Sequence, residues 1–194
     1  MQQPSVLVGM PHFSPQIYTE VFASVSRALR HPYIEKDNGL ILPMKQTRSI
    51  AEIRNDIVDF FLNKTQATHL LWLDGDQLYP YGMIDVLLAQ EKDIIGGWVM
   101  LRSEEIPNVY KWKDENKVEH IPVYPKGLTE VDRMGGGCVL VKREVYEKLP
   151  KPCYKYDEKH KTEDLYFCDL AKEKGYEIWV EGTIRCQHID ITYR

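Results

Sequence analysis

The sequence is poor in several features that mark whole classes of protein. Its 194 residues hold four cysteines and no C-x-x-C pair; the cysteines are Cys138, Cys153, Cys168 and Cys186. This argues against a zinc ribbon and against a disulfide scaffold, and favours reduced cysteines packed in a cytoplasmic protein. No apolar run approaches the roughly 18 residues of a membrane span. The first four residues lack the charged and apolar regions of a signal peptide.

An excess of basic residues is also missing. Lys and Arg number 25 against 29 Asp and Glu, which gives a formal net charge of −4. The chain therefore has no charge footprint for duplex DNA. Hydrophobic residues make up 43% and charged residues 28%, which is ordinary globular composition. The length predicts one domain over residues 1–194.

The first hundred residues alternate between short apolar runs and segments with helical periodicity. We predict strands at 5–9, 40–43, 69–73 and 93–97, with helices beginning at Ser14, Ser49 and Pro80. Ser49 and Glu52 have the spacing of a capping box. The alternation predicts a Rossmann-like α/β/α sandwich with a mostly parallel central sheet and right-handed crossovers.

The second half is more polar and predicts antiparallel additions to this sheet. We expect strands at 108–112, 117–124, 138–141, 177–180 and 183–188, and one helix over 162–174 that ends at Gly175.

Two carboxylates, Asp74 and Asp76, follow the most apolar strand, 69–73. Ligands of open α/β sheets bind at the carboxyl ends of strands. Residues i and i+2 of an extended segment point the same way, so the two acids are expected side by side, where a divalent cation relieves their repulsion. An EF-hand is excluded because Leu78 and Tyr79 stand where it needs an oxygen ligand and a glycine. A turn without a ligand is the alternative.

Further motifs follow in a fixed order along the chain. They are Arg54-Asn55, I-I-G-G-W-V-M at 94–100, M-G-G-G-C-V-L-V-K-R at 134–143, Thr162-Glu163-Asp164 and His188. Together with the D-x-D, this set resembles the GT-A glycosyltransferases, in particular family 2 and its short viral and bacterial relatives. The resemblance extends from Val6 to His188.

The resemblance implies a GT-A fold and a metal-dependent glycosyltransferase. The donor is a nucleoside-diphosphate sugar, with a UDP-sugar favoured, and the acceptor is a glycan, protein, lipid or modified nucleic acid. Residues 1–100 form the nucleotide-binding half and residues 101–194 the acceptor-binding half.

The resemblance also assigns roles to individual residues. The loop 10–13, with Pro11 and Phe13, holds the base and ribose. Asp74 contacts the ribose or the metal, Asp76 binds the metal, and His188 completes the metal site, with Asp190 as an alternative ligand. Asp164 matches the base of inverting members, and Glu163 is its neighbour.

The residues themselves suggest further contacts. Carboxylate and imidazole ligands suit Mn²⁺ or Mg²⁺. Arg48 and Arg54 are candidate diphosphate contacts, with surface ion pairs as the alternative. Gly136 and Gly137 allow the backbone to approach a ligand closely. Trp98 is either a sugar-stacking face or core packing.

Two other functions remain open from the sequence. A nucleotidyltransferase can share the fold, but it needs a glycine-rich basic loop after the first strand, where Gly9-Met-Pro-His stands. A non-catalytic sugar-nucleotide or glycan binding module is the other. The joint presence of the D-x-D, the Glu-Asp pair and the late His argues against it.

Overall fold

A computed structural model describes residues 3–11, 17–36, 39–41, 48–101, 106–114, 117–121, 127–160 and 162–189. Its main feature is an eight-stranded mixed sheet. The strands at one side are parallel: β1 (Val6–Gly9) lies between β2 (Leu40–Ile41) and β3 (His69–Leu73). Their apolar sequences suit strands covered on both faces.

The rest of the sheet contains both parallel and antiparallel pairs. β10 (Cys138–Lys142) runs antiparallel between β3 and β5 (Ile94–Val99). β11 (Ile178–His188) is parallel to β5 and pairs antiparallel with both β4 (Gln77–Leu78) and β8 (Leu128–Val131). The antiparallel strand β10 therefore lies inside the sheet, which brings the loop before it to the end of β3.

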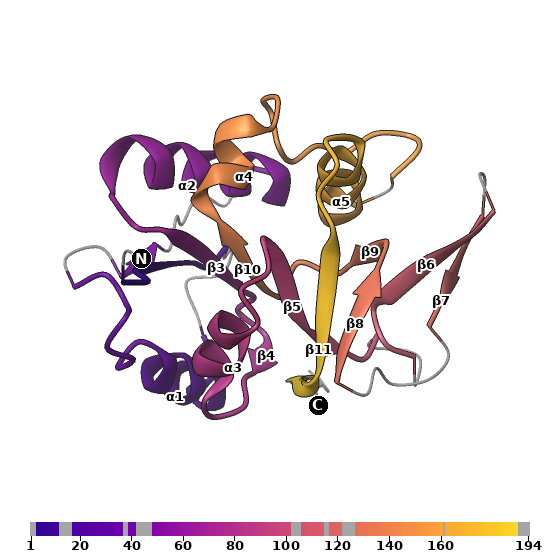
Figure 1. Ribbon diagram of the computed structural model, residues 1–194. Coiled ribbons are helices and arrows are strands. Elements are labelled where there is room, and N and C mark those ends of the chain that lie inside the picture. The colour runs from indigo at the N-terminus through magenta and orange to yellow at the C-terminus, as the bar shows by residue number, and fades with distance from the viewer. Residues whose placement is uncertain are drawn as a thin grey trace.

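Helices cover the two faces of this sheet (Figure 1). α2 (Ile50–Lys64), α4 (Arg143–Lys148) and α5 (Glu163–Glu173) pack on one face, and α1 (Thr19–Ala28) and α3 (Met83–Ala89) on the other. Alternate residues of β3 contribute to the two apolar cores: Leu70 and Trp72 belong to one and Leu71 and Leu73 to the other.

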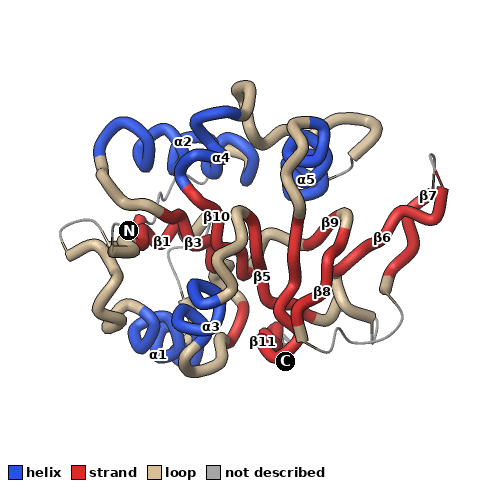
Figure 2. Tube along the Cα trace, in the orientation of Figure 1, coloured by secondary structure: helices blue, strands red, loops and turns tan. Residues whose placement is uncertain are grey.

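A second, three-stranded sheet lies at the side of the molecule away from β1 (Figure 2). It has the order β7 (Lys117–His120), β6 (Val109–Asp114) and β9 (Arg133–Met134). β9 leads through Gly135-Gly136-Gly137 into β10. The small sheet thus ends at the loop that approaches β3.

The sequence predicted the strand and helix order of the first half, and Ser49 and Glu52 form the expected capping box. The expected mostly parallel sheet is in fact mixed, because β10 is inserted antiparallel between β3 and β5. The two strands expected at 177–180 and 183–188 are one strand, β11, whose pairing with β5 shifts register between Val180 and Arg185.

The helix expected from Pro80 begins only at Met83, because Gly82 adopts a left-handed conformation with φ 76° and forms a turn before it. α4, β4, β8 and β9 were not predicted. All are short, and α4, β8 and β9 are rich in polar residues, so their hydrophobic periodicity is weak. Ser14 and Pro15, expected to begin the first helix, lie outside the described residues.

Two further expectations can be compared with the structure. All four cysteines are buried and free. No helix within the described ranges combines the length and apolar character needed to cross a membrane.

Candidate active site

The loop after β3 and the loop before β10 are joined by hydrogen bonds. The Asp74 amide donates to the Gly137 carbonyl oxygen at 3.2 Å. The Tyr79 hydroxyl bridges the same two residues, at 2.8 Å from the Asp74 carbonyl oxygen and 2.9 Å from that of Gly137. These contacts hold the D-x-D segment against the glycine-rich segment.

The D-x-D segment turns rather than continuing as an extended strand. Gly75 and Asp76 form a turn between β3 and β4. The extended-segment argument that set Asp74 and Asp76 side by side was therefore wrong, although Asp76 is close enough to contribute to the raised pKa of Asp74. Oδ1 of Asp76 is buried.

Arg54 forms ion pairs with two carboxylates of the site, Asp74 and Glu163. It projects from α2, and its side chain is only 3% exposed. Its Nη2 donates to Asp74 Oδ1 at 3.2 Å, its Nε to Glu163 Oε1 at 3.1 Å and its Nη1 to the Gly136 carbonyl oxygen at 3.4 Å. The guanidinium also lies over Trp72, 4.9 Å from the ring centroid. Arg54 therefore ties together the segments that carry these carboxylates.

Within this network, the pKa of the Asp74 carboxyl group departs clearly from its ordinary value. Burial raises the pKa of Asp74 to about 6, although the charge of Arg54 acts in the opposite direction. Burial likewise opposes the charge on Arg54, but Asp74 and Glu163 outweigh it and raise its pKa. Asp74 thus holds a proton more tightly than an exposed aspartate does.

The first turn of α5 carries the Glu-Asp pair. Asp164 Oδ2 accepts the Gly136 amide at 3.0 Å, and Oδ1 accepts the Leu165 amide at 2.8 Å and the Thr162 hydroxyl. Burial, followed by the charge of Glu163, raises the pKa of Asp164. Glu163 pairs with the Arg54 guanidinium, whereas Asp164 has the raised pKa that suits a proton acceptor.

His188 and Gln77 face each other across β11 and β4. Their Cα atoms are paired in the antiparallel register, which puts the side chains on one face. His188 Nδ1 is 2.8 Å from the Met100 carbonyl oxygen, so Nδ1 carries the proton and Nε2 is an acceptor. Gln77 Nε2 lies 3.4 Å from His188 Nε2 and 3.3 Å from Asp74 Oδ2.

Gln77 was missed by the sequence analysis. Its side chain is buried, and a glutamine after two acids has no distinguishing pattern. Only its position opposite His188 in the sheet reveals it. Within the described part of the chain, no three His, Cys, Asp or Glu side chains are grouped so that they can hold a metal.

Gly137 leaves no room for a side chain at this point. A Cβ atom there would lie 2.1 Å from Gln77 Nε2 and 2.7 Å from Asp74 Oδ2. A Cβ on Gly136 would lie 2.8 Å from Arg54 Nη2. The close approach expected of these two glycines was to a ligand; in the structure both glycines lie close to side chains of the site itself.

Other candidate residues lie apart from this cluster. Trp98 is buried, its indole nitrogen donates to the Gly182 carbonyl oxygen at 2.8 Å, and it belongs to an apolar core. Arg48 pairs with Asp56 at the start of α2. Pro11 is buried after β1, whereas Phe13 and Asp190 lie outside the described residues.

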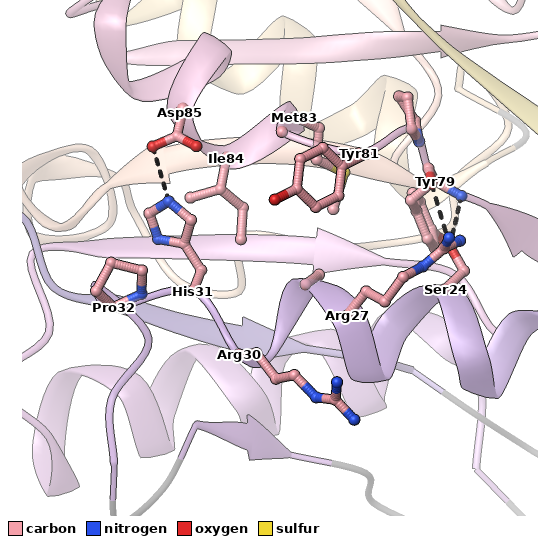
Figure 3. A pocket seen from close by; sticks show the side chains of 13 residues that line it. Ser24, Arg27, Arg30, His31, Pro32, Tyr79, Tyr81, Met83, Ile84 and Asp85 are labelled. Atoms are coloured by element: carbon pink, nitrogen blue, oxygen red, sulfur yellow. Dashed lines mark hydrogen bonds and ion pairs between the residues drawn. The ribbon is translucent and has the colours of Figure 1, made fainter.

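A cavity of about 560 Å³ lies elsewhere, between α1 and α3 (Figure 3). It is lined by Tyr81, which is 94% exposed, and by His31, whose Nε2 lies 2.8 Å from Asp85 Oδ1. Ser24 Oγ bonds to the backbone of Tyr79 there, while the Tyr79 hydroxyl reaches the candidate site. Tyr79 therefore lines the cavity with part of its residue and contacts the candidate site with its hydroxyl.

No family model and no curated protein matches the chain. Among solved structures, it is similar to A197 from STIV, with a TM-score of 0.68 and 18% identity over 96% of this chain and 86% of that one. It is also similar to GalNAc-T7, whose structure contains UDP, GalNAc and Mn²⁺, with a TM-score of 0.67 and 12% identity.

That second match covers 96% of this chain and 44% of GalNAc-T7, so this chain spans less than half of that protein's length. At these identities the similarity concerns the fold. The chain has a GT-A-like fold.

Proposed function

We propose that this protein is a metal-dependent glycosyltransferase that uses a nucleoside-diphosphate sugar, with a UDP-sugar favoured. One observation carries the proposal. On a GT-A-like fold, Arg54, Asp74, Gly136, Asp164 and His188 from separate elements come together where β3 ends. A chain needs no such gathering of acids and glycines for packing alone, because burying carboxylates is costly.

The donor half of the proposal rests on the D-x-D and glycine-rich segments. Asp74 and Asp76 contact the ribose and cation, and the backbone at Gly136 and Gly137 comes close to the ligand. Pro11 and Phe13 contact the base and ribose, and residues 101–194 contact the acceptor, which is a glycan, protein, lipid or modified nucleic acid.

The side chains gathered at this site are chemically suited to bind a divalent cation. The amide nitrogen of Gln77 lies within 3.4 Å of both Asp74 Oδ2 and His188 Nε2, and its buried amide oxygen has no hydrogen-bond partner among the described residues. Glycine at position 137 leaves room for this amide, since a Cβ there would lie 2.1 Å from its nitrogen. Asp74, Asp76 and His188 would hold Mn²⁺ or Mg²⁺ only by moving closer together when the cation binds, because in the structure they do not form a group of three side chains that could hold it. When bound, such a cation neutralises the charge that develops on a departing diphosphate.

The acceptor half rests on Asp164. Its Oδ2 is oriented by the Gly136 amide, and its raised pKa strengthens it as a base. We propose that Asp164 takes the acceptor hydroxyl proton in an inverting transfer. Glu163 and Arg54 hold the first turn of α5 against the D-x-D segment.

A thermal-shift panel tests the donor. UDP-, GDP-, CMP- and dTDP-sugars are each added with and without Mn²⁺. A ligand at a hundredfold excess over its Kd stabilises the folded state by about 2.7 kcal/mol. We expect a Tm increase with one nucleotide class only when Mn²⁺ is present, and its loss in Asp76→Ala, which keeps the fold. No shift with any of the four donors would refute the proposal.

Asp164→Asn tests the base. Removing a general base typically lowers a rate by about 10²–10⁴-fold. In Asp164→Asn, we expect the rate of UDP release from the donor sugar nucleotide to fall by this factor. The Mn²⁺-dependent Tm shift should be retained. Glu173→Gln, an exposed change at the other end of α5, is the control. Retention of the donor's anomeric configuration in the product would contradict the inverting role.

A further inference from the structure

The side chain of Gln77 lies at the point where two metal-binding atoms converge. Its Nε2 is 3.3 Å from Asp74 Oδ2 and 3.4 Å from His188 Nε2. Both of those atoms present lone pairs, since His188 Nδ1 is committed to the Met100 carbonyl. The amide group therefore occupies, with its partial positive hydrogens, the place between a carboxylate and an imidazole that a cation prefers.

The other end of the same amide has no partner. Oε1 of Gln77 is buried and has no hydrogen-bond partner among the described residues. The whole residue is only 2% exposed. A buried amide oxygen without a hydrogen bond costs on the order of 1–3 kcal/mol. The present orientation thus satisfies Asp74 and His188 at the expense of Oε1.

We propose that Gln77 is a ligand of the divalent cation and that its amide exchanges orientation when the cation binds. A half-turn of the amide brings Oε1 to the side of Asp74 Oδ2 and His188 Nε2, where it becomes a ligand. In the absence of the cation, Nε2 keeps these two atoms apart and hydrogen-bonded. This inference rests on the proposed metal-dependent function.

The neighbours of Gln77 fix the position of its side chain beside Asp74 and His188. Its backbone is fixed in β4 opposite His188, and Gly137 packs against its amide so closely that a Cβ would overlap it. Amide oxygens are accepted ligands of hard divalent cations. Gln77 would thus add an amide oxygen to the carboxylate and imidazole ligands, which is consistent with the described residues offering no ready cluster of three His, Cys, Asp or Glu.

Manganese binding without catalysis tests this proposal. Free Mn²⁺ is measured by electron paramagnetic resonance during titration of the wild-type protein, Gln77→Leu and Gln77→Glu, with and without UDP. We expect Gln77→Leu to weaken Mn²⁺ binding on the order of tenfold or more. Gln77→Glu keeps an oxygen and adds a charge, so it should bind Mn²⁺ at least as tightly as wild type.

A neighbouring glutamine provides the control. Gln187 is exposed, lies beside His188 on β11 and pairs with Leu78, so Gln187→Leu should leave Mn²⁺ binding unchanged. The Tm in a chelator is measured for each variant. If Gln77→Leu does not fold, the comparison of Gln77→Glu with wild type decides, because weakened binding in that variant contradicts an oxygen ligand at residue 77.

The outcomes separate this inference from the function on which it rests. Wild-type binding that Gln77→Leu leaves unchanged or tightens overturns the role of Gln77 alone. Equal weakening by Gln77→Leu and Gln77→Glu does the same. No Mn²⁺ binding by the wild-type protein, even with UDP, overturns the proposed metal-dependent function and the inference with it.

Discussion

At the residue scale, the charge balance of the candidate site depends on Arg54. Its guanidinium is buried and faces two carboxylates and one carbonyl oxygen. Arg54 was expected to contact a diphosphate or form a surface pair. We now propose that it orients Asp74 and Glu163, because its guanidinium already donates three hydrogen bonds within the site.

Removing Arg54 should destabilise the protein strongly. Arg54→Leu leaves Asp74 and Glu163 without their cation, and breaking a buried pair in this way costs about 3 kcal/mol. Urea denaturation at pH 7 measures the loss. Arg48→Leu is the matched control, since Arg48 pairs with Asp56 at the surface and its loss should have little effect. Equal effects of the two variants would contradict the structural role of Arg54.

The raised pKa of Asp74 predicts a pH dependence of stability. With a folded pKa of about 6 against an ordinary 3.8, the folded state binds a proton that the unfolded state has lost. The stability of the metal-free protein should therefore fall as the pH rises from about 4 to 6. Asp74→Asn cannot ionise and lacks this contribution.

Denaturation of both proteins in a chelator measures the difference. The stability of the wild type relative to Asp74→Asn should decrease from pH 4 to pH 6 and become constant above about 7. A relative stability that instead increases over this range would mean that the attraction of Arg54, not burial, dominates at Asp74.

Sequence reasoning could single out residues whose chemistry shows in a local pattern. Asp74, Gly137, Asp164 and His188 were singled out from motifs, and the structure connects them through Gln77 and Gly136. The position of Gln77 could not be inferred, because it depends on a register between β4 and β11 that lie 111 residues apart in sequence.

At the element scale, β10 and the three glycines before it determine where the site lies. β10 is antiparallel to β3, so its beginning meets the end of β3 and sets Gly137 against Asp74. The sequence predicted this strand among the antiparallel additions of the second half but not its neighbours, because an apolar run of five residues does not encode which strands it pairs with. The polar strands β8 and β9 escaped prediction for lack of periodicity.

Gly137→Ala should damage the site while the fold persists. The added Cβ overlaps Gln77 and Asp74, so Mn²⁺ binding should weaken on the order of tenfold or more, with a stability loss of about 1–3 kcal/mol. Gly135→Ala is the control for an equally close overlap in the same loop, because the atoms nearest its Cβ, the closest at 2.1 Å, belong to Asn108 and not to the proposed ligands. Titration of both variants with Mn²⁺ distinguishes them, and unchanged binding by Gly137→Ala would contradict the close packing at Gly137.

At the scale of the whole molecule, the two faces of the sheet carry different features. The candidate site lies at the strand ends near α2 and α5, whereas the cavity lies between α1 and α3, and Tyr79 contacts both. The α/β class and the order of the first strands were predictable from alternation of patterns. Antiparallel additions from the second half were also expected, but the strand order was not, because it arises from pairings between the two halves of the chain.

Anomalous diffraction from crystals grown with Mn²⁺ and UDP tests the central claim, that this cluster is a metal and nucleotide site. We predict a manganese peak bounded by Asp74, Asp76, Gln77 and His188, with the diphosphate of UDP in contact with it. A diphosphate bound in the cavity between α1 and α3, with no manganese at the cluster, would contradict it.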